Sequence, residues 1–187
     1  IKLIELSRSG DGYRVESYAA EPSPPNAINE KAIVDAQAVG EAVRRAVKRA
    51  GARAKEVAVA ISGDAAITKV IQMPRNLREA ELESQVEMQA DQYIPFPMEE
   101  VSFDFEVIGP SEKDPEMLDV LLVATRSENV EQRQASVQSA GLAARIVDVE
   151  AFALENACRL LTHQMPDGGM DRNIAVIDFG ASSTTFS

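Results

Sequence analysis

Hydrophobic and polar positions at the start of the chain predict strands before helices. Residues 1–7 and 13–20 alternate well enough to be two strands, and residues 9–12 have the glycines and aspartate of a hairpin turn between them. Residues 21–34 contain three prolines, which is typical of a surface connection. The chain is therefore expected to begin with an antiparallel hairpin.

The pattern then changes to helical spacing. In residues 36–50 apolar side chains recur every three or four positions, and Gly51 follows as a helix stop. Residues 56–61 predict a buried strand and residues 66–73 another, with a turn at residues 63–64. One helix and two strands are thus expected in this part of the chain.

A second helix is predicted to open at residues 74–76. Asn76 and Glu79 have the spacing of a capping box. Pro95 and Pro97 terminate the helix, and they hold Phe96 in a segment that must be extended. We interpret Phe96 as part of a packed helix exit rather than as a binding residue, since apolar loop residues are usually core. The expected apolar stripe of this helix consists of Leu82, Val86, Ala90 and Tyr93.

The remaining elements mix strands and helices. Residues 101–107 alternate as a strand with one buried face, and residues 117–125 form a nearly continuous apolar strand. A helix at 127–140, a strand at 145–149 and a helix at 151–164 follow. The order predicts an α/β fold with a more antiparallel insertion.

The last stretch carries the candidate chemistry. Residues 174–177 predict a buried strand that ends on Asp178, and the small residues Gly180, Ala181, Ser182, Ser183 and Thr184 follow. Successive backbone amides in such a turn can bind an anion, and a carboxylate beside them can bind a divalent cation or its waters. The alternative is a plain β-hairpin whose turn has this sequence.

Composition excludes several function classes. The chain has 187 residues and a net charge of −11, which argues against broad binding of nucleic acid or of anionic lipid. It contains one cysteine and one histidine, so zinc sites and Ser-His-Asp catalysis lack their usual residues. No stretch approaches the apolar length of a membrane span, and the cytoplasm is the simplest compartment.

Two sets of residues carry a resemblance to known families. The spacing of Asp178, Gly180 and Thr184 resembles the second phosphate-binding hairpin of the actin, Hsp70 and sugar-kinase superfamily. Residues 1–7, 89–104, 147–154 and 177–181 together resemble the PilM family, cytoplasmic actin-like proteins of type IV pilus assembly, and more distantly FtsA, the cell-division actin. The Tyr-Ile-Pro-Phe-Pro segment within the second block is the most discriminating feature.

The resemblance implies a domain organisation. It predicts one half of an actin-like (RNase H-like) ATPase fold, with subdomain 1A at residues 1–72 and 147–187 and an FtsA-type 1C insertion at residues 73–146. In that family a first phosphate hairpin directly precedes the strand at residues 1–7, and the adenosine-binding segment follows the second hairpin. The sequence is therefore expected to be an excerpt of a longer protein.

The resemblance also assigns roles to residues. Asp178 would hold Mg²⁺ through water, the amides from Gly180 to Ser183 would hold the phosphates of ATP, and Thr184 would support the hairpin. Glu150 would face the metal-bound nucleotide as a catalytic carboxylate, with Asp148 as the alternative. A glutamate at the start of a helix also has a purely structural explanation, because carboxylates favour helix N-termini.

The function implied is an ATP-binding scaffold, at most a weak ATPase. Its partners would be the cytoplasmic N-terminal tail of the membrane protein PilN, in a groove between subdomains 1A and 1C, and other cytoplasmic pilus components such as the motor ATPase. The protein would be peripheral to the inner membrane through these partners, with no direct insertion. The alternatives are a sugar- or acetate-kinase-like phosphotransferase of the same fold and an FtsA-like cell-division actin.

Overall fold

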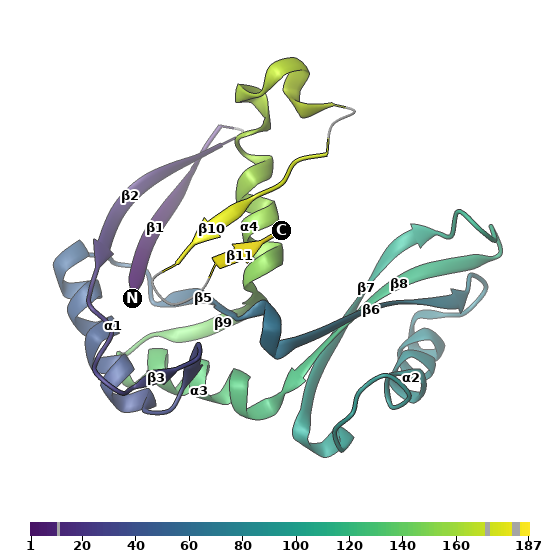
Figure 1. Ribbon diagram of the computed structural model, residues 1–187, viewed down its shortest axis with the longest axis horizontal. Coiled ribbons are helices and arrows are strands. Elements are labelled where there is room, and N and C mark those ends of the chain that lie inside the picture. Colours follow the sequence, from purple (N-terminus) through teal and green to yellow (C-terminus); the bar gives the residue numbers. More distant parts are fainter. Residues whose placement is uncertain (11, 171–172, 181–183) are drawn as a thin grey trace. The chain divides into compact units, whose positions relative to one another are not determined.

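The computed structural model describes residues 1–10, 12–170, 173–180 and 184–187. It is an α/β structure that contains parallel and antiparallel strand pairs, as the sequence predicts. The chain divides into two compact units: unit 1 comprises Ile1–Ser62 with Gln132–Ser187, and unit 2 comprises Gly63–Glu131 (Figure 1). The assignment to subdomains 1A and 1C stays a prediction.

Unit 1 contains short sheets and helices that follow one another along the chain. The strands are β1 (Lys2–Ser9), β2 (Gly12–Ala20), β3 (Ile28–Asn29), β4 (Ala32–Ile33), β5 (Glu56–Ile61), β9 (Ala143–Val149), β10 (Ile177–Phe179) and β11 (Thr184–Phe186). In the described residues unit 1 has four strand pairs. Three are antiparallel, β1–β2, β3–β4 and β10–β11, and one is parallel, β5–β9. The helices are α1 (Ala36–Ala50), the C-terminal part of α3 (Ser127–Ser139) and α4 (Glu150–Arg159).

Helix α1 has the predicted bounds because its ends are capped. The Asp35 carboxylate accepts a hydrogen bond from the backbone N–H of Ala38 at 2.9 Å, and Gly51 adopts a left-handed conformation that returns its N–H to Val47 O. The buried face of α1 packs with residues from β5, α3 and β9. This cluster forms around Ala27, Val39, Val43, Val137 and Leu142.

Unit 2 is an antiparallel sheet with one helix. The strand order is β6–β8–β7, with β6 at Ala66–Pro74, β7 at Val101–Pro110 and β8 at Met117–Arg126, and α2 spans Glu79–Ala90. Leu82, Val86 and Ala90 of α2 join Ile71, Met73, Ile94, Val120, Leu122 and Ala124 in one buried cluster. Figure 1 shows α2 beside this sheet. The three-stranded sheet therefore has a core on the side that α2 covers.

The start of α2 corrects the sequence prediction. The helix begins at Glu79 after Arg78, and the backbone N–H and guanidinium of Arg78 both donate to the Glu81 carboxylate, at 3.0 and 2.5 Å. The capping contact is thus displaced by two residues from the predicted Asn76–Glu79 box, because Pro74 still belongs to β6. Tyr93 lies beyond the helix end and is 40% exposed, so it is not part of the buried stripe.

The Tyr-Ile-Pro-Phe-Pro segment forms a packed exit from α2. Ile94 is buried in the core of unit 2, and Phe96 packs against that core. The Arg126 guanidinium lies 4.6 Å from the centre of the Phe96 ring, within the range of a cation–π interaction. The prediction that Phe96 packs at the helix exit is confirmed.

The C-terminal elements differ most from the prediction. The strand expected at residues 174–177 is β10, at Ile177–Phe179, and it is exposed instead of buried, with Ile177 51% and Phe179 79% accessible. In the described residues β10 pairs only with β11, in a two-stranded ribbon. Helix α4 also ends at Arg159, before the predicted residue 164, and short 3₁₀ turns follow it.

Candidate functional site

The candidate site of unit 1 lies where its parallel strands end. Strands β5 and β9 run parallel, with Ala60 opposite Asp148 and Ile61 opposite Val149. Helix α4 begins at Glu150, directly after β9. Because the carboxyl ends of neighbouring parallel strands meet at one sheet edge, ligands of α/β proteins bind there preferentially.

A strained turn delivers a lysine to this edge. Glu30 and Lys31 connect β3 to β4 with φ angles of 45° and 68°, although neither is a glycine. Two successive left-handed residues form the tight turn that normally selects Asn-Gly. The Arg133 guanidinium hydrogen-bonds Lys31 O at 2.9 Å and Ala60 O at 3.0 Å. Arg133 thereby ties the turn to the end of β5.

Lys31 connects the predicted catalytic carboxylate to the predicted phosphate hairpin. Its Nζ atom lies 3.6 Å from Glu150 Oε2 and donates to Thr185 Oγ1 at 3.4 Å. Thr185 is the cross-strand partner of Asp178 in the β10–β11 pair. Residues directly opposite each other in an antiparallel pair have side chains on the same face. Lys31 therefore links Glu150 to Thr185, and Asp178 lies on the same face of the hairpin as Thr185.

A partly buried guanidinium, that of Arg133, lies close to Glu150 and contributes to the electrostatics of this region. Burial lowers the pKa of Arg133, and the negative charge of Glu150 partly opposes that shift. Glu150 itself is about half exposed, with 48% of its side chain accessible. The Asp148 carboxylate accepts a hydrogen bond from the backbone N–H of Val149 at 2.7 Å, so it supports the end of β9.

The other predicted site residues have separate outcomes. Gly180 and Thr184 are exposed and flank the tip of the C-terminal hairpin. Ala181, Ser182 and Ser183 lie outside the described residues. The roles of Glu150, Asp178, Gly180 and Thr184 toward a nucleotide stay predictions.

Sequence reasoning missed Lys31, Arg133 and Thr185. Residues 21–34 have the prolines of a surface connection. The turn residues Glu30 and Lys31 are neither glycine nor asparagine, so they do not signal a two-residue hairpin. Arg133 follows the polar pattern of an ordinary helix surface. Of the three, only Thr185 had a sequence signal, because it follows Thr184 in the predicted hairpin.

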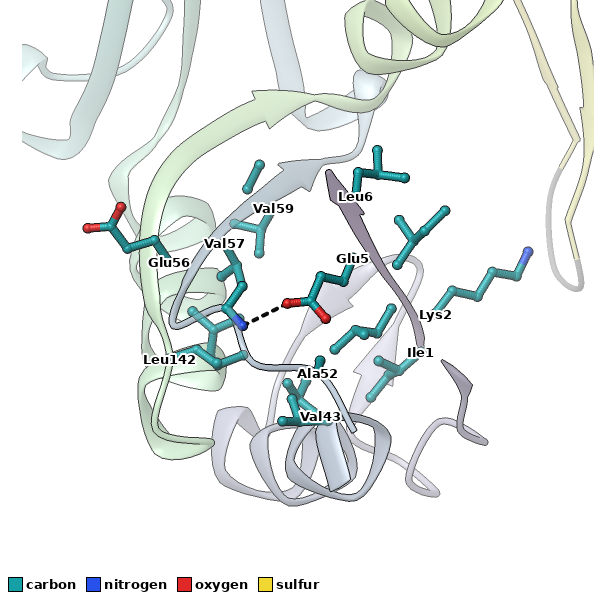
Figure 2. A pocket seen from close by; sticks show the side chains of 16 residues that line it. Ile1, Lys2, Glu5, Leu6, Val43, Ala52, Glu56, Val57, Val59 and Leu142 are labelled. Atoms are coloured by element: carbon teal, nitrogen blue, oxygen red, sulfur yellow. Dashed lines mark hydrogen bonds between the residues drawn. The ribbon is translucent and has the colours of Figure 1, made fainter. Parts of the chain in front are cut away.

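A second feature of unit 1 is an apolar pocket of about 500 Å³ (Figure 2). Residues 1–6 line one side and residues 56–59 the other, and Val43, Val47 and Leu142 are among its remaining lining residues. Side chains of a strand alternate between its two faces. A run of consecutive lining residues on both sides therefore means that the edges of β1 and β5 border the pocket.

The Glu5 carboxylate connects two lining segments of this pocket. Glu5 of β1 accepts a hydrogen bond from the backbone N–H of Ala54 at 2.8 Å (Figure 2) and another from that of Arg53 at 3.1 Å. These bonds, the one from Ala54 most, lower the pKa of Glu5. In the described residues β1 pairs with β2 and β5 pairs with β9, so Glu5 ties the β1–β2 sheet to the loop that leads from α1 into β5.

Comparison with known proteins decides the family. The family model described as type IV pilus assembly protein PilM matches residues 1–187, the whole chain. The chain belongs to the PilM family. A solved structure of a PilM–PilN type IV pilus biogenesis complex is similar to it, with a TM-score of 0.82 and 30% sequence identity. That match covers 99% of this chain and 53% of the other.

Two further features concern the described residues alone. Among the described residues, no helix has the length and apolar character that crossing a membrane requires. The same residues contain no group of three or more histidine, cysteine or acidic side chains placed to hold a metal ion.

Proposed function

We propose that the chain is part of an ATP-binding, actin-like cytoplasmic scaffold that binds the cytoplasmic tail of PilN in type IV pilus assembly. Family membership over the full length of the chain supports the pilus role. The observation that carries PilN binding is the likeness, over 99% of this chain, to a protein solved in complex with PilN. The scaffold would connect PilN to the pilus motor from the cytoplasmic side of the inner membrane.

The chemistry expected of the tail follows from its short length and from the net charge of the chain. A short peptide has few sources of affinity besides apolar anchors, so these should dominate its binding. The net charge of −11 favours basic residues beside the anchors, mainly through faster association. A tail with apolar anchors and basic flanks is therefore expected.

Calorimetric titration of the tail peptide into the chain tests this proposal. Replacing the apolar anchors of the peptide by serine should abolish binding, whereas raising the salt concentration should weaken it only moderately. The matched control is a peptide of the same charge whose apolar residues are permuted. Binding that falls steeply with salt and ignores the loss of the anchors would contradict the proposal.

The polar side chains of the candidate site fit the phosphates of a nucleotide. An ammonium at Lys31 and a hydroxyl at Thr185 are donors, and the carboxylates of Asp178 and Glu150 are suited to a metal-bound water. When bound, Mg-ATP supplies the phosphate anion and the metal charge that these groups would balance. The donor set thus supports a phosphate site at the carboxyl edge of β5 and β9.

Each residue of the proposed nucleotide site would have one role. Asp178 would hold the water shell of the metal, and the backbone amides from Gly180 to Ser183 would bind phosphate oxygens. Thr184 would support the hairpin. Glu150 would orient a water molecule, with slow hydrolysis at most. Nucleotide would then set the closure of the protein and its affinity for partners more than it would drive work.

The apolar pocket supports the actin-like assignment. Two strand edges that face a pocket can be joined by one more strand, which would pair with both. We propose that a further strand, that of the first phosphate hairpin in the actin-like arrangement that the resemblance implies, fills this pocket. A phosphotransferase of the same fold remains the alternative, and phosphate transfer to a small-molecule acceptor in a substrate panel would favour it.

A further inference from the structure

Lys31 holds an unusual position in the candidate site. Its side chain is 28% exposed and extends from a two-residue turn in which both residues are left-handed. Left-handed conformations of residues other than glycine are uncommon and persist where the surrounding structure fixes them. Here the surrounding group is Arg133, which donates to Lys31 O. The turn is therefore held in the conformation that presents the ammonium group.

The contacts of the ammonium group are long. Its distances of 3.6 Å to Glu150 Oε2 and 3.4 Å to Thr185 Oγ1 exceed the about 2.7–2.9 Å of a charge-assisted hydrogen bond. An ammonium has three donors, and a phosphate oxygen is a stronger acceptor than a hydroxyl. Lys31 thus lies between two groups without binding either of them closely.

The proposed roles of Thr185 and Glu150 indicate which ligand group would lie between them. Thr185 is in the hairpin proposed to bind the phosphates, and Glu150 is the carboxylate proposed to orient water. Attack on a phosphoryl group needs the water in line with the bond that breaks, so the terminal phosphate has to lie between the hairpin and the carboxylate. Lys31 spans that interval.

We infer that Lys31 binds the terminal phosphate of ATP and so makes this site discriminate ATP from ADP. The inference rests on the proposed nucleotide binding and deepens it. Without nucleotide the ammonium pairs loosely with Glu150. With ATP it turns to the terminal phosphate, which releases the Glu150 carboxylate for water. With ADP that contact is missing and the pair with Glu150 persists.

Titration of the full-length protein with fluorescent ATP and ADP, in the presence of Mg²⁺, tests the inference. Lys31→Met should weaken ATP binding about tenfold, the size of one charged phosphate contact, and ADP binding less than about threefold. Lys31→Arg should retain part of the preference because it keeps the charge. Lys48→Met, which removes the same charge from the exposed side of α1, is the matched control and should change neither affinity.

A second readout needs no substitution. Labelling of lysine amines, followed by mass spectrometry, should show Lys31 protected by Mg-ATP more than by Mg-ADP, with Lys48 labelled equally in both. Equal losses for ATP and ADP in Lys31→Met, together with equal protection, would overturn the role of Lys31 and leave nucleotide binding intact. A wild-type protein that binds neither nucleotide would instead overturn the proposed site and this inference together.

Discussion

Asp178 and Glu150 belong to different elements, and their surroundings differ. Asp178 is exposed in a short hairpin opposite Thr185, whereas Glu150 starts α4 and lies 3.6 Å from the ammonium of Lys31. A carboxylate opposite a hydroxyl is suited to holding a hydrated metal, and one at a helix start beside a lysine is suited to orienting water. The two residues should therefore fail in different ways when they are replaced.

In the full-length protein, Asp178→Ala should weaken nucleotide binding that depends on Mg²⁺. The loss should be smaller without Mg²⁺, because the carboxylate then repels the phosphates. Glu150→Ala should leave affinity within a few-fold and slow any hydrolysis on the order of 100-fold, as for a positioned base. Nucleotide titration with and without Mg²⁺, beside single-turnover hydrolysis, measures both effects. Equal binding losses in the two variants would mean that Glu150 is a ligand or a structural residue.

Glu5 gives a prediction about pH. Hydrogen bonds from Ala54 and Arg53 lower its pKa in the folded state. A carboxyl group with a lowered pKa stabilises the fold above its unfolded pKa, about 4.3, and this contribution is lost as the pH falls through the folded pKa. Glu5→Gln should therefore lower the Tm at pH 7, and the difference from wild type should shrink toward pH 3.

Thermal unfolding at pH 7, 5 and 3 checks this expectation. Glu87→Gln, on the exposed side of α2, is the matched control for the loss of one negative charge. A Tm difference between Glu5→Gln and wild type that stays constant down to pH 3 would show that the hydrogen bonds to Glu5 do not stabilise the charged form.

At the scale of elements, a helix or strand is predictable from the sequence where several independent signals agree. Helix α1 was predicted with its observed bounds because the apolar spacing agrees with the glycine stop. Helix α2 was misplaced because residues 74–76 offer a turn and a plausible cap, yet Pro74 completes β6. Burial of β10 could not be inferred, since an apolar run indicates a strand and does not show what covers it.

The site shows the same limit. A motif and its resemblance point to Glu150 and Asp178, and in the structure Lys31 links Glu150 to Thr185, the residue opposite Asp178. Lys31 and Arg133 could not be found, because their roles come from a strained turn and a long-range hydrogen bond. Contacts between residues far apart in sequence leave no local pattern.

The packing of α1 on α3 predicts the effect of one methyl group. A Cβ at Gly40 would lie 1.6 Å from Ser139 Oγ and 2.5 Å from Ser136 O, which is a backbone atom. Gly40→Ala should therefore push the helices apart and destabilise the protein by about 1–3 kcal/mol, as overpacking does. Urea unfolding measures this change.

Gly63→Ala is the matched control, because a Cβ there meets nothing within 4 Å. It should be neutral or slightly stabilising, since alanine narrows the unfolded ensemble. A Gly40→Ala variant as stable as Gly63→Ala would contradict the close approach of α1 and α3.

At the scale of the whole molecule, the chain spans 53% of the length of the solved relative that it matches. A nucleotide held by two hairpins and two domains loses most of its contacts when one hairpin alone is present. A partner peptide that contacts only residues of this chain would lose nothing.

Parallel titration of the 187-residue chain and the full-length protein, with the PilN tail and with Mg-ATP, tests the account most directly. The chain should bind the tail within a few-fold of the full-length affinity and bind Mg-ATP at least about 100-fold more weakly, the loss of two or more charged phosphate contacts. Micromolar binding of Mg-ATP by the chain alone, or failure of the chain to bind a tail that the full-length protein binds, would contradict it.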